Sequence, residues 1–131
     1  MNNKNIIHIE GSEFWGRYIY LIAAQGFALV KLMFDNRCSK GVCEIGEVNT
    51  HPCKQRQGYA TMLMQEAERI AKENGCTVIQ LWTKKYSWMQ EWYERMGYEV
   101  QDFMQVPSDD IIWLCKFIKD SKLIPLAFSI T

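Results

Sequence analysis

Apolar residues are spaced differently in the two halves of this chain. Gln25 and Gly26 separate two apolar runs of the first half, and glycine readily adopts the positive φ that a tight turn requires, so these runs are expected to form a hairpin. The apolar and aromatic runs predict strands at residues 6–9, 18–24, 27–34 and 42–50. The first half is therefore interpreted as a sheet of short strands.

The second half alternates between helix and strand patterns. From Gly58 to Asn74 the apolar residues recur at steps of three and four, which predicts an amphipathic helix that ends at Gly75. Ser87 and Gln90 have capping-box spacing and predict the start of a second helix that runs to residue 97. Strands are expected at residues 77–82, 98–103 and 111–118. This order of elements indicates an α+β fold, with a mixed sheet and packed helices.

The composition is that of a single globular domain, with 131 residues, of which 48% are hydrophobic and 23% charged. Fifteen basic and fifteen acidic residues cancel, which argues against binding to nucleic acid or to a membrane by charge alone. No apolar run reaches the roughly 20 residues of a bilayer span. We expect a domain over residues 1–118, a tail over residues 119–131 that is an edge strand, a partner-docking segment or a remnant, and a cytoplasmic location.

The cysteines indicate neither a disulfide framework nor a metal site. The five cysteines are an odd number without a Cys-x-x-Cys pair, and only two histidines accompany them, so reduced thiols and no bound metal are expected. His51 and Cys53 stand two residues apart at the end of a predicted strand, where they would share one side and suggest a nucleophilic pair. The pair lacks a third, orienting group, so a non-catalytic interpretation is preferred.

The segment from Val48 to Ala60 has the pattern of an anion site, with a strand, a polar loop and a helix that begins at a glycine. Backbone N–H groups at a helix start are unpaired, and the helix dipole is positive there. Gly58 lets a ligand approach the backbone closely, while Lys54 and Arg56 add positive charge. Residue types alone leave two interpretations open: a site for a phosphate-bearing ligand, or an ordinary loop before a helix.

Two motifs resemble those of the GNAT superfamily of N-acetyltransferases. Gln55-x-x-Gly58-x-Ala60 is similar to the Q/R-x-x-G-x-G/A signature that wraps the pyrophosphate of acetyl-coenzyme A. The run from Trp92 to Tyr98 is similar to the hydrophobic-Tyr-Glu-Lys-x-Gly-Phe run that ends the family's next helix. The motifs stand in the family's order. The resemblance implies a GNAT-like fold with a mixed, mostly antiparallel sheet and helices on both faces.

The resemblance also implies an activity, the transfer of an acetyl group from acetyl-coenzyme A to a primary amine without a metal. Glu44 is the favoured general base, Glu47 is the alternative, and Tyr93 holds the family position of the general acid. A regular strand would place Glu44 and Glu47 on opposite faces, and a bulge would change that. The residues assigned to the cofactor are Val48, Thr50, Gln55, Arg56, Gln57, Gly58, Tyr59, Ala60 and Thr61.

The chain departs from the family pattern near its start. Residues 10–17 are too few for the one or two helices that the family carries between its first two strands, so the N-terminal helical region is shortened. The acceptor side is then open, or is completed by another subunit or by the tail, and an open side suits a macromolecular amine. The aromatic residues that would line it, unless they are simply core, are Trp15, Trp82, Trp88 and Trp92.

Other interpretations stay open at this point. Tyr86 stands where many members have an asparagine that contacts the cofactor, and Lys84 with Lys85 is either a site for the cofactor's 3′-phosphate or a solvated pair. The chain would alternatively be a non-catalytic acyl-coenzyme A sensor or scaffold. Modification of nucleic acid is a third function, which the neutral net charge does not support. A homodimer is also open.

Overall fold

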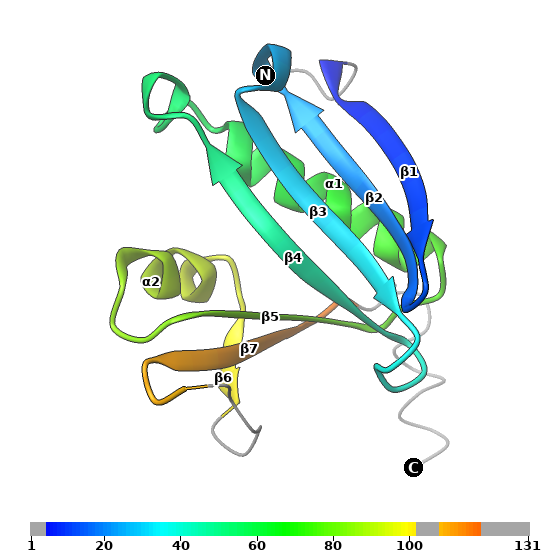
Figure 1. Ribbon diagram of the computed structural model, residues 1–131. Helices are drawn as coiled ribbons and strands as arrows, with labels where there is room; N and C mark the ends of the chain where they lie inside the picture. The colour runs from blue at the N-terminus through cyan, green and yellow to red at the C-terminus, as the bar shows by residue number, and fades with distance from the viewer. Residues whose placement is uncertain (1–4, 102–107, 119–131) are drawn as a thin grey trace.

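The computed structural model describes residues 5–101 and 108–118, so the tail and part of the predicted strand at 98–103 lie outside the described residues. Figure 1 shows the arrangement of the elements. In chain order they are β1 (Ile7–Glu13), β2 (Gly16–Ala23), the 3-10 turn η2 (Ala24–Gly26), β3 (Ala28–Asp35), β4 (Val42–Thr50), the 3-10 turn η3 (Pro52–Lys54), α1 (Tyr59–Glu73), β5 (Val78–Lys84), α2 (Trp88–Arg95), β6 (Glu99–Gln101) and β7 (Ile111–Phe117).

The strands form one seven-stranded sheet in the order β1-β2-β3-β4-β5-β7-β6. Neighbouring strands are antiparallel except β4 and β5, which are parallel. The parallel pairing is short, since it joins only residues 42–44 of β4 to residues 78–80 of β5. Beyond this point the two strands diverge, as Figure 1 shows. The predicted mixed, mostly antiparallel sheet is confirmed.

The first two strands are joined directly, without a helix between them. Strand β1 pairs with β2 along its whole length, from Ile7 opposite Ile22 to Glu13 opposite Gly16. Gly16 has a φ of 142°, and a Cβ there would lie 2.0 Å from the carbonyl oxygen of Phe34, so the turn requires glycine. The shortened N-terminal region is therefore a hairpin. Its first strand is longer than predicted because its polar residues lie on an exposed sheet edge.

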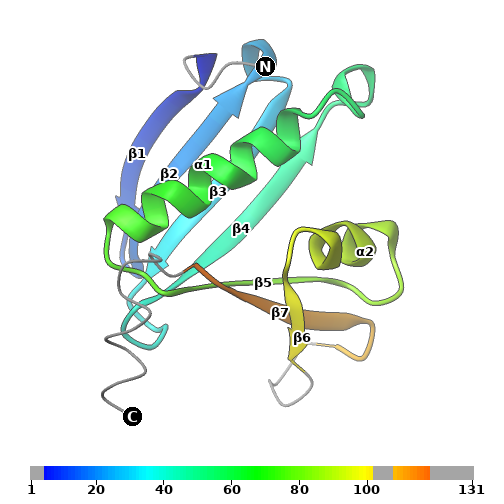
Figure 2. The same cartoon turned by 180° about the vertical axis from the view of Figure 1, so that it is seen from behind.

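The core lies on one face of the sheet. Helix α1 crosses β2, β3 and β4 on that face, as Figure 2 shows from behind, and buries side chains such as Leu63 and Ala67 against them. Alternate strand residues, among them Leu21, Val30 and Leu32, are fully buried beneath it. Hydrophobic burial of this kind is the main stabilising contribution to the fold.

The second helix contributes to the same core. Its buried Tyr93 contacts the ring of Tyr98 at 5.9 Å, and the Tyr98 hydroxyl donates to Glu68 of α1 at 3.2 Å. The structure thus differs in one detail from the expectation of helices on both faces. The described chain has no helix between β1 and β2, and neither α1 nor α2 covers the opposite face.

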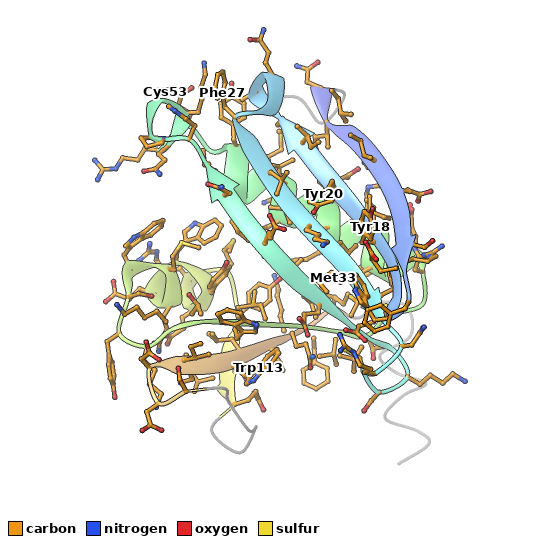
Figure 3. All side chains as sticks on the ribbon, viewed as in Figure 1. Tyr18, Tyr20, Phe27, Met33, Cys53 and Trp113 are labelled. Atoms are coloured by element: carbon orange, nitrogen blue, oxygen red, sulfur yellow. The ribbon has the colours of Figure 1, made fainter. Side chains whose placement is uncertain are left out.

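The opposite face of β2, β3 and β4 is called the helix-free face here. In the pairing of β2 with β3, Tyr18 lies opposite Met33 and Tyr20 lies opposite Lys31. All four side chains are on the side of the sheet away from the buried alternate residues. Figure 3 shows Tyr18, Tyr20 and Met33 on this side of the sheet. The Lys31 ammonium lies 5.0 Å from the ring centre of Tyr18 and 5.2 Å from that of Tyr20, so the two rings hold this lysine by cation–π contacts within the face.

One buried carboxylate fastens the edge strand to α1. Glu66 of α1 accepts hydrogen bonds from Arg69 at 2.7 and 2.8 Å, and it lies 2.7 Å from the Nε2 atom of His8 on β1. The hydrogen bonds from Arg69 lower the pKa of Glu66 to about 2, with His8 adding to the effect.

Neither α1 nor α2 has the length and apolar character of a membrane-crossing helix, and residues 5–101 and 108–118 hold no other candidate.

Candidate functional site

The loop between β4 and α1 is braced by its own side chains. The amide nitrogen of the Gln55 side chain donates to the Thr50 carbonyl at 3.0 Å, and that of Gln57 donates to the Cys53 carbonyl at 3.2 Å. Arg56 and Gly58 both have left-handed backbones, with φ of 64° and 84°. Glycine adopts this conformation without strain, whereas arginine does so rarely. The two left-handed residues turn the chain so that α1 begins at Tyr59.

The first turn of α1 presents unpaired backbone donors. The helix begins without a side-chain cap, since its N-cap residue is Gly58. Its first backbone hydrogen bond runs from the Met62 N–H to the Gly58 carbonyl at 3.0 Å. The N–H groups of Tyr59, Ala60 and Thr61 precede this bond and have no partner within the helix. With the positive end of the helix dipole, they form a site that favours a negative ligand.

A cavity of about 690 Å³ opens at this helix start. Its walls are the end of β4, the following loop, the first turn of α1 and one side of α2. Lys54, Arg56 and Arg95 are its charged lining residues, and none of the described residues that line it is a carboxylate. The cavity is lined by Val48, Asn49, Thr50, Lys54, Gln55, Arg56, Gly58, Tyr59, Ala60, Thr61, Trp88, Met89, Trp92 and Arg95. Charge, exposed amides and size together suit a large phosphate-bearing ligand.

A bulge in β4 brings two carboxylates onto the helix-free face. Glu44 pairs with Met33 and Glu47 with Lys31, and these partners are two residues apart on β3. Gly46 is the extra residue, and a Cβ there would lie 2.1 Å from the Met33 sulfur. The bulge therefore places Glu44 and Glu47 on the same side of the sheet, where a regular strand would separate them.

The two carboxylates have different environments. Glu44 is half-buried at the last residue pair before β4 and β5 diverge, and it accepts a hydrogen bond from Gln80 at 2.9 Å. Burial raises the pKa of Glu44, although the Gln80 hydrogen bond opposes the shift. Glu47 is exposed and accepts a 3.5 Å hydrogen bond from the Tyr20 hydroxyl. Glu44 therefore holds its proton to a higher pH than a solvated glutamate would.

Tyr93 lies in the core beside the cavity wall. Tyr93 is buried, with an exposed fraction of 4%. The centre of its ring lies 5.1 Å from the ring centre of Trp92, which lines the cavity. Burial raises the pKa of Tyr93, so its hydroxyl keeps its proton at neutral pH. None of the hydrogen bonds between described residues involves this hydroxyl, and no buried side-chain oxygen among those residues lacks a partner, so solvent reaches the hydroxyl. It is thus a protonated group with an unused donor.

The comparison with known proteins decides the family. The model of the acetyltransferase (GNAT) family matches residues 7–98, which is more than half of the chain. The chain belongs to the GNAT acetyltransferase family.

Solved structures support the GNAT fold. One is an acetyltransferase of the GNAT family from Desulfovibrio desulfuricans, with a TM-score of 0.66, 14% identity and coverage of 79% of this chain and 69% of that one. Another is an acetyltransferase from Bacillus subtilis in complex with CoA, with a TM-score of 0.63, 16% identity and coverage of 86% and 98%. A third is the PaiA N-acetyltransferase from Thermoplasma acidophilum in complex with coenzyme A, with a TM-score of 0.62, 18% identity and coverage of 76% and 59%. None of the curated proteins compared with the chain matches it in sequence.

The structure brings together most of the residues that the GNAT motifs predict for the cofactor. Eight of the nine line the cavity, and Gln57 is the exception because its side chain turns back to Cys53. The predicted catalytic residues Glu44, Glu47 and Tyr93 do not line it. Their roles stay predictions.

One wall of the cavity was not predicted from the sequence. Trp88, Trp92 and Arg95 lie at helical spacing on one side of α2 and face the cavity, whereas the two tryptophans had been associated with the acceptor side. The helical spacing of these residues indicated that they share one side of α2, but it did not tell whether that side faces the core or a cavity. Only the packing of α2 across from α1 decides between these two possibilities. The tryptophan on β5, Trp82, does lie half-exposed on the side away from the core.

The remaining candidates lie outside the cavity. Tyr86 is 94% exposed, and Lys84 and Lys85 are not among the lining residues. No group of three His, Cys, Asp or Glu side chains among residues 5–101 and 108–118 is arranged to hold a metal ion.

Proposed function

We propose that this GNAT protein transfers the acetyl group of acetyl-coenzyme A to a primary amine. The observation that carries the proposal is the cavity at the start of α1, where unpaired amides and three cations meet without a carboxylate among the described lining residues. Coenzyme A has a diphosphate and a further phosphate, so it matches this charge. Two structurally similar acetyltransferases are complexes with coenzyme A, which supports this ligand.

The cofactor is proposed to lie along β4, with its phosphates at the start of α1 and its thioester at the other end of the strand. The diphosphate binds the amides of Gly58 to Thr61, with Lys54, Arg56 and Arg95 around it. The described part of β5 pairs with β4 only up to Glu44, so the β4 backbone from residues 45 to 50 has groups free toward the diverging side. The amides of the pantetheine arm pair there, and the thioester points toward the place where β4 and β5 separate.

The reaction is direct attack of the amine on the thioester. A lysine-like amine has a pKa of about 10.4 and is mostly protonated at pH 7, so Glu44 takes a proton from it, directly or through water. The nitrogen then attacks the carbonyl carbon, and a β4 backbone N–H stabilises the oxyanion. The C–S bond breaks, and the departing thiolate takes a proton from Tyr93. The nitrogen loses its second proton to water as the amide forms, and Tyr93 is reprotonated from water. Glu47, on the same face, is the alternative base.

The acceptor is proposed to approach over the helix-free face. This face carries both carboxylates, Glu44 and Glu47, which favour a cationic acceptor, whereas the rings of Tyr18 and Tyr20 are already occupied by Lys31. It has no helical cover among the described residues, which favours a large acceptor, such as a polypeptide amine, over one that needs an enclosed pocket.

A second function, binding acyl-coenzyme A without transfer, is supported by one observation. Neither carboxylate nor Tyr93 lines the cavity, so the proposed catalytic groups are separate from the proposed cofactor groups. A sensor or scaffold would need only the latter.

The decisive experiment combines a binding and a turnover measurement. Release of free thiol from acetyl-coenzyme A is followed over a panel of small amines, amino-terminal peptides and lysine peptides. Amine-dependent thiol release with formation of an acetylated product is expected. Saturable binding of acetyl-coenzyme A without release for any acceptor would favour the sensor, and absence of binding would contradict both.

A further inference from the structure

His51 and Cys53 form a contact pair at the loop that precedes the cavity. The Nδ1 atom of His51 lies 3.0 Å from the Sγ atom of Cys53, and the Cys53 backbone N–H donates to the same Nδ1 atom at 3.2 Å. Because Nδ1 accepts the backbone N–H, it is the unprotonated ring nitrogen. The single lone pair of Nδ1 is therefore shared between this N–H and the thiol, whose sulfur lies within hydrogen-bond reach of the nitrogen.

The imidazole is held in this position from two sides. The His51 backbone N–H donates to the Phe27 carbonyl at 2.7 Å, and the two aromatic rings are in edge contact at 5.2 Å. Pro52 follows, and the Lys54 N–H closes the 3-10 turn on the His51 carbonyl at 2.8 Å. The turn η2 and the turn η3 thus fix the ring relative to the thiol. Figure 3 shows Phe27 and Cys53 near each other at one end of the sheet.

Cys53 is the exposed cysteine of the five. Cys43 is buried, and Cys38, Cys76 and Cys115 are half-buried. Burial raises the pKa of the Cys38 thiol to about 11 and also raises the pKa of Cys43 and of Cys115. Because the thiolate is the nucleophilic form of cysteine, these three thiols react slowly at neutral pH. Access and a neighbouring base distinguish Cys53.

We propose that Cys53, with His51 as its base, is a covalent modification site for small disulfides, and that the adduct weakens cofactor binding. In the reaction the thiol proton passes to His51 Nδ1 and the Cys53 sulfur attacks one sulfur of the disulfide. A new S–S bond forms, the original S–S bond breaks, and the second sulfur leaves as a thiolate. Cys53 is oxidised to a mixed disulfide, and the leaving half of the reagent is reduced.

The position of Cys53 gives the adduct its effect. Lys54, Gln55 and Arg56 follow it directly and line the cavity, and the Cys53 carbonyl receives the hydrogen bond that braces Gln57. A bulky group on this thiol displaces the loop that surrounds the helix start. The effect on the cofactor rests on the proposed function, whereas the reactivity of the thiol does not.

The reactivity is tested with dithiodipyridine, a chromogenic disulfide, on the folded full chain, with peptide mapping to locate the adduct. Cys53 is expected to react first, and His51→Asn is expected to slow it by roughly ten-fold or more, because asparagine keeps a cap for the Cys53 N–H but supplies no base. Cys53→Ser removes the fast phase, and Cys115→Ser leaves it unchanged. An adduct that forms first at another cysteine, or an unchanged rate in His51→Asn, would overturn the site.

The consequence is tested by calorimetry with acetyl-coenzyme A before and after treatment with oxidised glutathione. Modified wild-type protein is expected to bind about ten-fold more weakly, with recovery after reduction by dithiothreitol, while treated Cys53→Ser binds as before. Equal affinity of the modified and untreated proteins would overturn the link to the cavity. If untreated protein does not bind the cofactor, the proposed function fails while the selective reaction of Cys53 still stands.

Discussion

The cavity at the start of α1 and the helix-free face are built in opposite ways. The cavity is made largely from one continuous stretch, residues 48–61, in which a loop, a left-handed glycine and a helix start follow one another. The helix-free face is assembled from separate strands, and its two carboxylates share a side only because β4 bulges at Gly46 against β3. The cavity is cationic, whereas the face combines Glu44 and Glu47 with aromatic rings.

Under the proposed function, this contrast separates cofactor binding from chemistry. A continuous segment can bind a diphosphate independently of the strand register of the sheet, because its backbone amides and nearby charges are sufficient. The acceptor side depends on strand register, where a slip of one residue would turn a side chain to the other face. Substitutions in the cavity should therefore change cofactor affinity, and substitutions around the carboxylates should change turnover.

The largest effect is expected from Gly58→Glu. A side chain at a φ of 84° is strained, and a carboxylate beside the helix start repels the diphosphate, so the affinity for acetyl-coenzyme A should fall by roughly a hundred-fold or more. The control is Gly75→Glu, since Gly75 has a similar φ of 82° at the other end of α1 and nothing near its missing Cβ. Calorimetry measures both variants. Retained tight binding in Gly58→Glu would break the assignment of the cavity.

Glu44→Gln is expected to lower turnover by about a hundred-fold and to leave cofactor affinity unchanged, because it removes the proposed general base, which lies outside the cavity. Glu47→Gln is the matched control and should have a small effect. The wild-type rate should rise with pH through the raised pKa of Glu44, since only the carboxylate accepts a proton. A larger loss in Glu47→Gln, measured by thiol release, would transfer the role of base to Glu47.

Tyr93→Phe is expected to lower turnover by roughly ten-fold or more without weakening cofactor binding, because the hydroxyl is proposed to protonate the departing thiolate. The melting temperature should change little, since none of the described residues offers this hydroxyl a hydrogen bond. Thiol release and thermal unfolding are measured on the same sample. Unchanged turnover would remove Tyr93 from the mechanism.

Arg95→Ala sharpens the cavity side of the comparison. Loss of one of three cations should weaken acetyl-coenzyme A binding by about five- to ten-fold at low salt, and the difference should shrink as salt rises. The control is Arg17→Ala, which removes an exposed arginine that binds Asn74 away from the cavity. Equal effects of the two variants would show that Arg95 acts only through net charge.

The smallest effect is a change in stability. The raised pKa of Glu44 means that the folded protein holds this proton more tightly than the unfolded chain, so ionisation at neutral pH costs stability. Glu44→Gln should therefore raise the melting temperature slightly at pH 7, and the gain should vanish in acid, where the carboxyl is protonated in both states. A lower melting temperature at pH 7 would contradict a burial cost at Glu44.

The elements were predictable because their signals are local. Helix α1 was expected from Gly58 to Asn74 and spans Tyr59–Glu73, and β4 has the predicted bounds of residues 42–50. Both stand between strong turn or glycine signals. Most of the cavity followed from the same stretch, together with the family resemblance.

What the sequence left open depends on long-range pairing. The register of β3 against β4 decided whether Glu44 and Glu47 share a face, and no residue of β4 alone reveals that register. The cavity wall of α2, with Arg95, depends on where that helix packs. The side of the sheet that stays uncovered depends on the direct β1-β2 hairpin, which the short spacer of residues 10–17 had indicated only in part.

The most direct test of the account compares two ligands by calorimetry on the folded protein. One is acetyl-coenzyme A, and the other is S-acetyl-pantetheine, which keeps the thioester and arm but lacks the phosphates and the adenosine. Because the amides at the start of α1 and the three cations are proposed to grip the diphosphate, acetyl-coenzyme A should bind at one site and the truncated ligand at least about a hundred-fold more weakly. Equal affinity for the two ligands, or no heat with millimolar acetyl-coenzyme A, would contradict it.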